Sequence, residues 1–417
     1  MTAVAYDRRA LRPGIVHFGA GNFFRAHQAA YFDALLAGGG DPGWGICAVG
    51  TRPGDAPVRD ALRQRYGAYS LVLRQPSGEV AEWTIGSICE YLFAPDDADA
   101  VWSRLVHPDT RIVSLTITEG GYLGNTELFA SIAAALVARR DATVDPFTVL
   151  SCDNITRNGA VARAAVLAAA SSAADAEWIA THAAFPNSMV DRITPATTDG
   201  DYGTVIAEWF AQWVIEDAFC AGRPALERVG VQLVADVAPY EEMKLRLLNG
   251  AHQAIAFAGL LLGHVFVHEA VADPSITALL RAFFVETIPT VRGVEGIDLD
   301  AYCATLVSRF SNAAIADTLA RLAANTIDRI PTFVLPAVRD NLRAGRGVDA
   351  GAFAVAAWAH HLEAQPAPDA PPGEALLGLD EYFADLRVVP AFADSFAGSL
   401  ARLRADGVRA AILALGG

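Results

Sequence analysis

A short apolar run followed by a glycine-rich turn stands near the start of the chain, and it constrains the fold more than any other stretch. Residues 15–18 read Ile-Val-His-Phe, which is typical of a buried strand, and residues 19–25 read Gly-Ala-Gly-Asn-Phe-Phe-Arg before an apolar helical pattern. Strand, glycine-rich turn and helix are the layout of a dinucleotide-binding unit. Gly19 and Gly21 let the backbone turn sharply and approach a pyrophosphate, although Phe24 replaces the third glycine of the full motif.

The next predicted strand, residues 44–50, bears on which dinucleotide is bound. It is followed by Thr-Arg-Pro-Gly-Asp, so Asp55 is placed to bind the ribose hydroxyls of adenosine and to favour NAD. Arg52 opens an alternative, because an arginine there can stack on adenine or pair with a 2′-phosphate. Both residues can also be ordinary charges of a solvated loop.

Two further apolar runs, residues 111–118 and 147–154, predict buried strands of the same sheet. In open α/β sheets, ligands bind beyond the carboxyl ends of the strands. Thr118 and Glu119 stand at the end of the first run and Asn154 at the end of the second. These three residues are therefore predicted to lie at the ligand-binding edge.

The remaining pattern predicts two domains. Residues 158–174 are alanine-rich and predict a crossover helix, whereas residues 185–195 have the punctuated polar character of a site loop. From about residue 237 the pattern is helical almost throughout. The prediction is an α/β protein, with a Rossmann-like dinucleotide-binding domain over residues 1–237 and a mainly α-helical substrate-binding and catalytic domain over residues 238–417.

Lys244 is the only lysine of the chain, although lysine and arginine together number 32. At exposed positions the exchange of lysine for arginine is close to neutral, because each side chain mainly supplies a charge on a flexible stem. Arginine is effectively always protonated, whereas a desolvated lysine amine can lose its proton. A lone lysine therefore indicates a general base or a Schiff-base nucleophile, with an accident of a biased composition as the alternative.

The residues around this lysine predict a helix from about Pro239 to Leu262. At about 100° per residue, Glu241, Lys244, Asn249 and His252 fall within an arc of roughly 140°. One face of an otherwise apolar helix would thus carry a carboxylate, an amine, an amide and an imidazole. Buried polar groups need partners or a purpose, so this face is either a catalytic set or a satisfied structural network.

The composition indicates where the protein is located in the cell and which classes of partner it does not bind. A net charge of −15 argues against nucleic acid, which basic patches recognise. Five scattered cysteines without a Cys-x-x-Cys pair indicate neither disulfides nor zinc, which predicts a cytoplasmic protein, and no cluster has the spacing of metal ligands. Residues 247–268 carry no Asp, Glu, Lys or Arg and are long enough to cross a bilayer. They contain Asn249, Gln253 and three histidines, so a buried core helix is predicted and a membrane is not.

With these residues in place, the chain resembles the mannitol dehydrogenase family of long-chain polyol-specific dehydrogenases. The resemblance runs along most of the sequence and rests on several motifs in the family's order. These motifs are His17-Phe18-Gly19-Ala20-Gly21, Arg25-Ala26-His27-Gln28, residues 114–122, Ser151-Cys152-Asp153-Asn154, Phe185-Pro186-Asn187, residues 190–195, the helix of Lys244 and Arg309-Phe310-Ser311-Asn312.

The resemblance implies a metal-independent, NAD-linked interconversion of a secondary alcohol and a ketone. The expected assembly is a monomer or small homo-oligomer, between which the sequence does not decide. By matching of motifs, Lys244 would be the general base and Glu241 a proton-relay carboxylate. Asn154 and Asn249 would hold the developing oxyanion, and His252 would orient the reacting oxygen. The substrate hydroxyls would be bound by Asp191, Arg321, Arg329 and Asn187, and the cofactor by Gly19, Gly21, Phe24, Arg25, Arg52, Asp55, Thr118 and Glu119.

The expected activity is an NAD-dependent polyol dehydrogenase that converts a mannitol-like or arabinitol-like sugar alcohol and its ketose into one another. Within the family, Arg321 and Arg329 also suit the carboxylate of fructuronate or tagaturonate, so a uronate reductase is the alternative. Arg329 stands where mannitol dehydrogenases carry lysine, and the turn at residues 21–25 departs from the usual family sequence. A β-hydroxyacid dehydrogenase and a non-catalytic NAD-binding sensor are the remaining alternatives.

Overall fold

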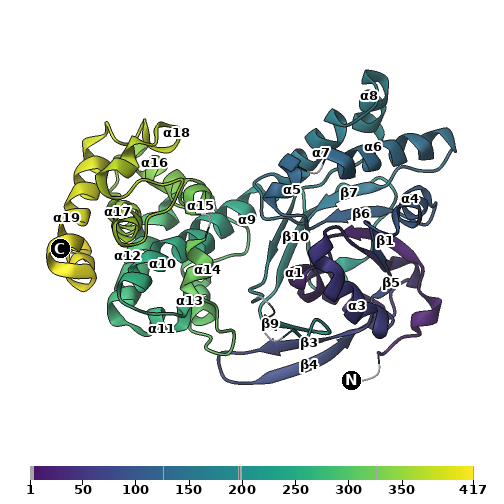
Figure 1. The fold of residues 1–417 in the computed structure, drawn as a ribbon, viewed down its shortest axis with the longest axis horizontal. Helices are drawn as coiled ribbons and strands as arrows, with labels where there is room; N and C mark the ends of the chain where they lie inside the picture. Colours follow the sequence, from purple (N-terminus) through teal and green to yellow (C-terminus); the bar gives the residue numbers. More distant parts are fainter. Residues whose placement is uncertain (1–3, 125, 196, 198–199, 325, 417) are drawn as a thin grey trace. The chain divides into compact units, whose positions relative to one another are not determined.

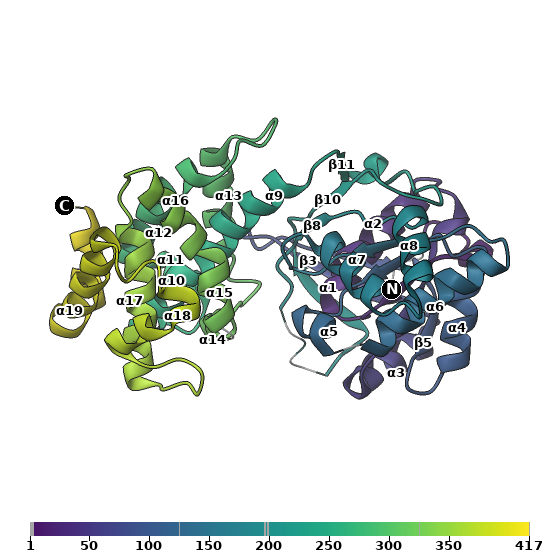
Figure 2. The ribbon, with the colours of Figure 1, turned by 90° about the horizontal axis from the view of Figure 1, so that it is seen from above.

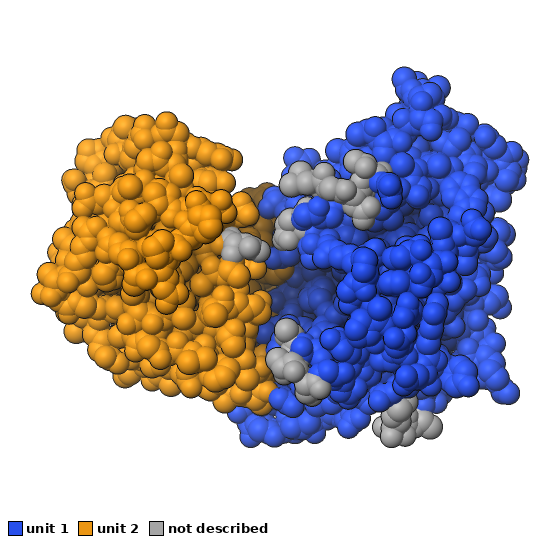
Figure 3. Space-filling view, in the orientation of Figure 1, with its two compact units in different colours: residues 1–238 blue, residues 239–417 orange. Residues whose placement is uncertain are grey.

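The computed structural model describes residues 4–124, 126–195, 197, 200–324 and 326–416. The chain divides into two compact units, residues 1–238 and 239–417 (Figure 3). Two hydrophobic cores lie in the first unit and one in the second. Each unit therefore has the buried apolar interior that an independent domain requires.

A parallel sheet of five strands is the centre of the first unit, in the order β5-β2-β1-β6-β7 (Figure 1). The strands are β1 (Pro13–Phe18), β2 (Gly45–Gly50), β5 (Ile88–Phe93), β6 (Ile112–Leu115) and β7 (Thr148–Ser151). Neighbouring side chains alternate between the two faces. Ile46 and Ala48 enter one core, whereas Cys47 and Val49 enter the other. Burial on both faces explains the nearly continuous apolar runs of these strands.

Helices cover both faces of this sheet (Figures 1 and 2). One face is covered by α1 (Asn22–Ala26), α2 (Gln28–Ala37) and α3 (Ala56–Gln64), and the other by α4 (Ala98–Val106), α6 (Thr126–Asp141), α7 (Asn158–Ala168) and α8 (Ala173–His182). The short helix α5 (Glu119–Gly124) follows β6 directly. This is the doubly covered parallel sheet of a Rossmann-like fold, as the sequence predicted.

Two three-stranded sheets complete the first unit. Their orders are β4-β3-β9 and β11-β10-β8. The strands are β3 (Tyr69–Arg74), β4 (Val80–Ile85), β8 (Ser188–Asp191), β9 (Thr204–Glu208), β10 (Gln212–Glu216) and β11 (Gln232–Val234), and the short 3-10 turns are η1 (Arg8–Ala10), η2 (Pro42–Trp44), η3 (Pro53–Asp55) and η4 (Leu226–Val229).

Two local predictions in this region were wrong. The stretch 185–195 is not a loop throughout, because β8 lies inside it and pairs antiparallel with β10. The helix predicted over 158–174 ends at Ala168, and Ser172 starts α8 by accepting a hydrogen bond from the backbone N–H of Asp175. A serine cap of this kind outweighs the helix propensity of the surrounding alanines.

The second unit consists of helices around α10, which packs against α12, α14, α15 and α17 (Figure 2). Its elements are α9 (Ala238–Met243), η5 (Lys244–Asn249), α10 (Gly250–Leu261), α11 (Val267–Ala272), α12 (Pro274–Thr287), η6 (Ile288–Thr290), α13 (Leu299–Phe310), α14 (Leu319–Ala323), α15 (Thr326–Phe333), α16 (Leu335–Arg343), α17 (Asp349–Ala364), η7 (Gly373–Gly378), α18 (Asp380–Phe383), α19 (Pro390–Leu413) and η8 (Ala414–Gly416). Within its described residues there are isolated bridges but no strand.

The helix predicted from about Pro239 to Leu262 is present, but it is not α-helical throughout. The segment η5 between α9 and α10 is a π-helix. The following helix α10 is buried along ten of its twelve residues, which agrees with the predicted core helix. Of the helices in the described part of the chain, none has the length and apolar character to cross a membrane.

The absent third glycine of the first turn has a packing explanation. Phe24 is 1% exposed and its ring stacks on the ring of His17, with centroids 3.6 Å apart. Nδ1 of His17 lies 2.7 Å from Oγ of Ser114, and its Nε2 lies 2.9 Å from Oγ1 of Thr116. Burial lowers the pKa of His17 to about 3. A neutral histidine and an aromatic ring thus fill the space next to the turn.

Replacement of His17 by asparagine is expected to weaken the dependence of stability on acid. Between pH 6.5 and about 3 the unfolded chain binds a proton that the folded chain does not. His17 therefore makes the free energy of unfolding fall as the pH is lowered through this window, by up to about 1.4 kcal/mol per pH unit. In His17→Asn this part of the slope should be absent.

Urea unfolding at pH 7, 6 and 5 measures this slope. Tryptophan fluorescence reports mainly on the first unit, because six of the seven tryptophans precede residue 238. A His182→Asn variant, at an exposed position of α8, is the matched control for loss of a histidine. Equal slopes in wild type and His17→Asn would contradict the prediction.

Candidate active site

The carboxyl ends of the parallel strands bring the predicted cofactor residues of the first unit to one edge. Gly19 follows β1 with φ of +99°, and a Cβ atom there would lie 2.1 Å from the carbonyl oxygen of Thr116. Only glycine fits such a position. A Cβ on Gly21 would meet no atom within 4 Å, so this backbone faces open space. The turn is therefore closely packed on its inner side and accessible on its outer side.

Two predicted cofactor residues of this turn are used for packing instead. The ring of Phe24 lies in the core against His17, so only its backbone is available to a ligand. The side chain of Arg25 is fully buried, and its guanidinium donates to the carbonyl oxygen of Tyr202 at 2.6 Å and to Oδ1 of Asn22 at 2.8 Å. A contact between the Arg25 side chain and a cofactor is thus not supported, because its charge is held inside the unit.

The loop after β2 holds Asp55 and Arg52 in different ways. Oδ2 of Asp55 accepts hydrogen bonds from the backbone N–H groups of Thr51 at 2.8 Å and Arg52 at 2.9 Å, which caps the turn η3. Nη2 of Arg52 donates to the carbonyl oxygen of Ile117 at 3.0 Å and lies 3.3 Å from Oγ1 of Thr118. The guanidinium of Arg52 thus links the carboxyl ends of β2 and β6, which lie on either side of β1.

Thr118 has a strained backbone at the end of β6. Its φ is +65°, a conformation that a β-branched residue adopts only when its surroundings impose it. The Thr118 N–H donates to Oδ1 of Asp153 at 2.7 Å, and Oδ2 of Asp153 accepts from the hydroxyl of Tyr122 at 2.8 Å. Asp153, which is 6% exposed, therefore ties the end of β7 to the end of β6. Glu119 was predicted beside Thr118, but its side chain lies outside the described residues.

Three predicted residues of the first unit have unlike surroundings. Asn154 is exposed just beyond β7, where a ligand can reach it, and Asp191 ends β8 with 4% exposure. Asn187 is committed to the fold: its Nδ2 donates to the carboxylate of Glu216 at 3.0 Å, and its Oδ1 accepts from the N–H of Ala160 at 3.2 Å. The side-chain amide of Asn187 therefore connects β10 with α7, and a substrate contact of this residue stays a prediction.

The π-helical segment η5 carries the lone lysine. Lys244 begins this segment and is 7% exposed, and Asn249 ends it. The N–H of Gly250 donates to the carbonyl oxygen of Leu245, which is the bond of a residue to the fifth before it. π-turns inside α-helices are rare and occur frequently at functional sites. The backbone is thus irregular at the place where the sequence concentrates its polar residues.

The other predicted catalytic residues lie on the helices that flank this segment. Glu241 of α9 is 9% exposed and His252 of α10 is 6% exposed. The ring of His252 lies 4.3 Å from that of Phe310, at the end of α13. Oδ1 of Asn249 is buried and receives no hydrogen bond from the described residues. A buried amide oxygen of this kind needs an explanation, and a bound ligand is one.

The two predicted substrate arginines of the second unit are close in space. Nε and Nη2 of Arg321 donate to the two carboxylate oxygens of Asp317 at 2.6 and 2.5 Å, which is a bidentate pair. Nη1 of Arg329 donates to the carbonyl oxygens of Arg321 and Leu322 at 3.0 and 3.1 Å. Arg321 therefore presents an ion pair rather than an isolated positive charge.

Three residues that hold the segments of the candidate site in place were not predicted from the sequence. Asp153 stands inside a motif that the sequence singled out, but its contact with Thr118 depends on the pairing of β6 and β7. Arg246 and Asp340 form an ion pair although they are 94 positions apart in the sequence, so no local pattern could predict it.

Among the described residues, no group of three or more His, Cys, Asp or Glu side chains is arranged to hold a metal ion.

The sequence matches two domain families in succession. Residues 13–228 match the mannitol dehydrogenase Rossmann domain, and residues 236–403 match the mannitol dehydrogenase C-terminal domain. Mannitol 2-dehydrogenase of Phaeosphaeria nodorum is 40% identical over 403 residues, which cover 87% of this chain and 71% of the relative. Mannitol 2-dehydrogenase of Aspergillus fumigatus is 40% identical over 402 residues, which cover 86% of this chain and 80% of the relative.

Solved structures of polyol dehydrogenases are similar to this chain as well. The ternary complex of Pseudomonas fluorescens mannitol 2-dehydrogenase with NAD and D-mannitol superposes with a TM-score of 0.88 at 39% identity, covering 99% of this chain and 96% of that protein. A D-sorbitol dehydrogenase in substrate-free form superposes with a TM-score of 0.85 at 34% identity, covering 98% and 96%. Two successive domain matches, these relatives and these structures establish that the chain belongs to the mannitol dehydrogenase family.

Proposed function

We propose that this protein is an NAD-dependent polyol dehydrogenase, which interconverts a sugar alcohol and its ketose by hydride transfer at a secondary alcohol. Family membership supplies the reaction class. The observation that carries the proposal to this chain is the position of Lys244, the only lysine, which is buried at the start of a π-turn that ends at Asn249. We also propose a cytoplasmic location, because the five cysteines are all free thiols.

The first unit has the features that NAD needs. The outer side of Gly21 is open, and the carboxyl edge of the sheet presents backbone groups of the Gly19 turn, the Asp55 loop and Thr118. These residues would hold the dinucleotide, with Asp55 toward the adenosine ribose. NAD, when bound, supplies the acceptor for a hydride. The protein's own task is therefore to bind the alcohol, orient it and remove its hydroxyl proton.

We assign that proton transfer to Nζ of Lys244. Lys244 is 7% exposed, and a general base has to be neutral before it can accept the hydroxyl proton. The side-chain amides of Asn154 and Asn249 would donate hydrogen bonds to the oxygen as negative charge develops on it. His252 would orient the same oxygen, and Glu241 would pass the proton on toward solvent. Asp191, Arg321 and Arg329 would bind the remaining hydroxyls.

The arginines favour a neutral polyol over a uronate. A substrate carboxylate is recognised best by a guanidinium with free donors. In this chain Nε and Nη2 of Arg321 are already bonded to Asp317, which is 7% exposed. A substrate carboxylate there would have to share this guanidinium with the carboxylate of Asp317, and the two like charges repel each other. A hydroxyl group, in contrast, can use the pair as donor and acceptor together.

A substrate panel is the direct test of the function. Purified protein with NAD should reduce NAD in the presence of mannitol, arabinitol or sorbitol, read as NADH absorbance at rising pH, and should oxidise NADH with the matching ketoses. The same assay with fructuronate, tagaturonate and β-hydroxyacids covers the competing reactions. Turnover only with those acids would overturn the polyol assignment, and NAD binding without any turnover would indicate a sensor.

The cofactor preference should follow Asp55. We expect a higher kcat/KM with NAD than with NADP, because the carboxylate of Asp55 repels a 2′-phosphate. In Asp55→Asn an oxygen still caps the turn, but the charge is gone, so the preference should fall by about tenfold, which corresponds to roughly 1.4 kcal/mol. Arg52→Ala is the complementary variant and should lower kcat/KM with NADP. A wild-type preference for NADP would show that Arg52 dominates this end of the site.

Replacement of Lys244 by arginine separates a base from a mere positive charge. Arginine retains the charge but cannot release a proton. We expect kcat to fall by about a thousandfold, roughly 4 kcal/mol of activation free energy, with NADH binding nearly unchanged. The limb of the pH profile that reports a deprotonated base should also disappear. The matched control is Arg281→Lys, which makes the reverse exchange at an exposed position of α12.

The same lysine can be observed directly. Because the chain has one lysine, protein labelled with 13Cε-lysine gives one side-chain resonance, whose pH titration is the titration of Lys244. A midpoint well below the ordinary value for a lysine is what the proposed role as general base requires. A Lys244→Arg variant within tenfold of wild-type kcat would reject Lys244 as the base.

A further inference from the structure

The spacing of Lys244 and Asn249 makes their alignment depend on the π-turn. In a regular α-helix, residues five apart point in directions roughly 140° from each other, at about 100° per residue. In a π-turn the hydrogen bond joins residues five apart, as the bond from Gly250 N–H to Leu245 O does. Residues five apart are then one turn apart on one face, as residues four apart are in an α-helix. A π-turn therefore places the proposed base and the proposed oxyanion donor closer together around the helix axis than a regular α-helix would.

The turn needs support from other elements to keep this register. A π-helix is rare, which indicates that its backbone is less favourable than that of a continuous α-helix. Leu247 and Leu248 bury their side chains, and η5 packs against α12, α13 and α15. The close packing of these side chains stabilises the segment and limits its rotation. A hydrogen-bonded ion pair adds a directional contact to this packing.

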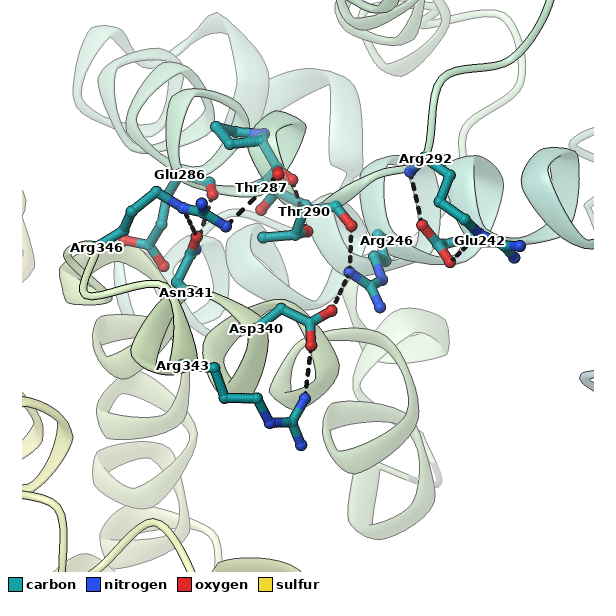
Figure 4. A network of polar contacts seen from close by, with 11 residues as sticks. Glu242, Arg246, Glu286, Thr287, Thr290, Arg292, Asp340, Asn341, Arg343 and Arg346 are labelled. Atoms are coloured by element: carbon teal, nitrogen blue, oxygen red, sulfur yellow. Dashed lines mark hydrogen bonds and ion pairs between the residues drawn. The ribbon is translucent and has the colours of Figure 1, made fainter.

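Arg246, at the centre of the π-segment, makes such a contact (Figure 4). Its Nη1 lies 2.7 Å from Oδ2 of Asp340 on α16 and donates to the carbonyl oxygen of Thr290 in η6 at 2.6 Å. The Arg246 side chain is 14% exposed and that of Asp340 is 33% exposed. One guanidinium therefore connects the middle of the turn with two other elements of the second unit.

The partners of Arg246 are themselves held in place (Figure 4). Asn341, next to Asp340, is fully buried, and its Nδ2 donates to the carbonyl oxygen of Glu286 on α12 at 2.8 Å. The carboxylate of Glu286 accepts the N–H groups of Ala350 and Gly351 at the start of α17, at 2.8 and 2.9 Å. The carboxylate of Asp340 is thus presented from a helix that is fixed to two others.

A second contact lies one turn earlier on the same helix (Figure 4). The carboxylate of Glu242 accepts the backbone N–H of Arg292 at 2.7 Å and its Nε at 3.0 Å. Glu242 belongs to α9 and Arg246 to η5, so the helix is held on both sides of Lys244. The side chain of Arg292 is 55% exposed, which makes this contact the weaker of the two.

We infer that Arg246 and Asp340 are positioning residues, whose ion pair holds the π-turn in the register that aligns Lys244 with Asn249. This inference rests on the proposed function, in which Lys244 and Asn249 act on one oxygen atom. Neither Arg246 nor Asp340 is assigned a contact with substrate. Their effect on the reaction passes through the backbone of η5.

The test removes the charge of Asp340 and little else. Asp340→Asn is nearly isosteric, so the fold should persist. We expect kcat with the best polyol to fall at least tenfold, while the dissociation constant for NADH, which is bound by the first unit, changes less than twofold. Asp340→Glu retains a carboxylate and should retain more of kcat. The control Arg343→Gln removes the other ion pair of Asp340, to an Arg343 side chain that is 72% exposed, and should leave kcat unchanged.

The lysine resonance gives a readout that does not depend on turnover. In Asp340→Asn and in Arg246→Gln, the 13Cε signal of Lys244 and its titration midpoint should both move, whereas Arg343→Gln should leave them in place. The double variant Arg246→Gln/Asp340→Asn should be no worse in kcat than Arg246→Gln alone, because Arg246→Gln already removes the ion pair as well as the bond to Thr290.

The outcomes separate this inference from the proposed function. Wild-type kcat together with an unmoved lysine signal in Asp340→Asn would overturn the positioning role, even if polyol turnover is established. A lower midpoint of thermal unfolding without movement of the lysine signal would also overturn it, since a merely structural pair would behave in this way. If no polyol is turned over, the proposed function fails, while a displaced lysine signal would still show that the ion pair sets the π-turn.

Discussion

The parallel pairing of five strands, buried on both faces, is the constraint on which the first unit depends. Parallel neighbours bring all their carboxyl ends to one edge, so segments that are far apart in the sequence leave the sheet side by side. The backbone N–H and C=O groups at this edge need hydrogen-bond partners. Asp55 caps its loop, Asp153 holds the strained backbone of Thr118, and neutral His17 sits beneath the glycine turn. Each of these bonds fixes backbone that a dinucleotide can contact, before any ligand is present.

The second unit has a different arrangement, because polar residues stand inside a largely apolar helix. An α-helix satisfies its backbone within itself and presents its side chains on fixed faces. The π-turn changes this pattern at one place and so alters which side chains are neighbours. Its cost is a less favourable backbone, which the surrounding unit offsets through packing of Leu247 and Leu248 and through the bonds of Arg246.

Arginine and lysine are not interchangeable in this chain. Several arginines are buried and serve the fold: Arg139 is 1% exposed and donates to the carbonyl oxygens of Leu105, His107, Thr110 and Asp145. A guanidinium can satisfy several carbonyls at once because it has five donors in a plane. The idea that arginine merely replaces lysine at exposed positions is therefore incomplete. A lysine is retained only at Lys244, to which we assign the proton transfer.

Local patterns in the sequence determined the fold class, the order of the two halves and the family, because burial periodicity, the glycine turn and the lone lysine are all visible in short stretches. Only the tertiary structure decided which residues are committed to packing. Arg25 and Asn187 stand in family motifs, yet their polar atoms are bonded within the first unit. The π-turn and the pair of Arg246 with Asp340 were equally hidden, because helix register and contacts between distant positions depend on packing energies that no local pattern contains.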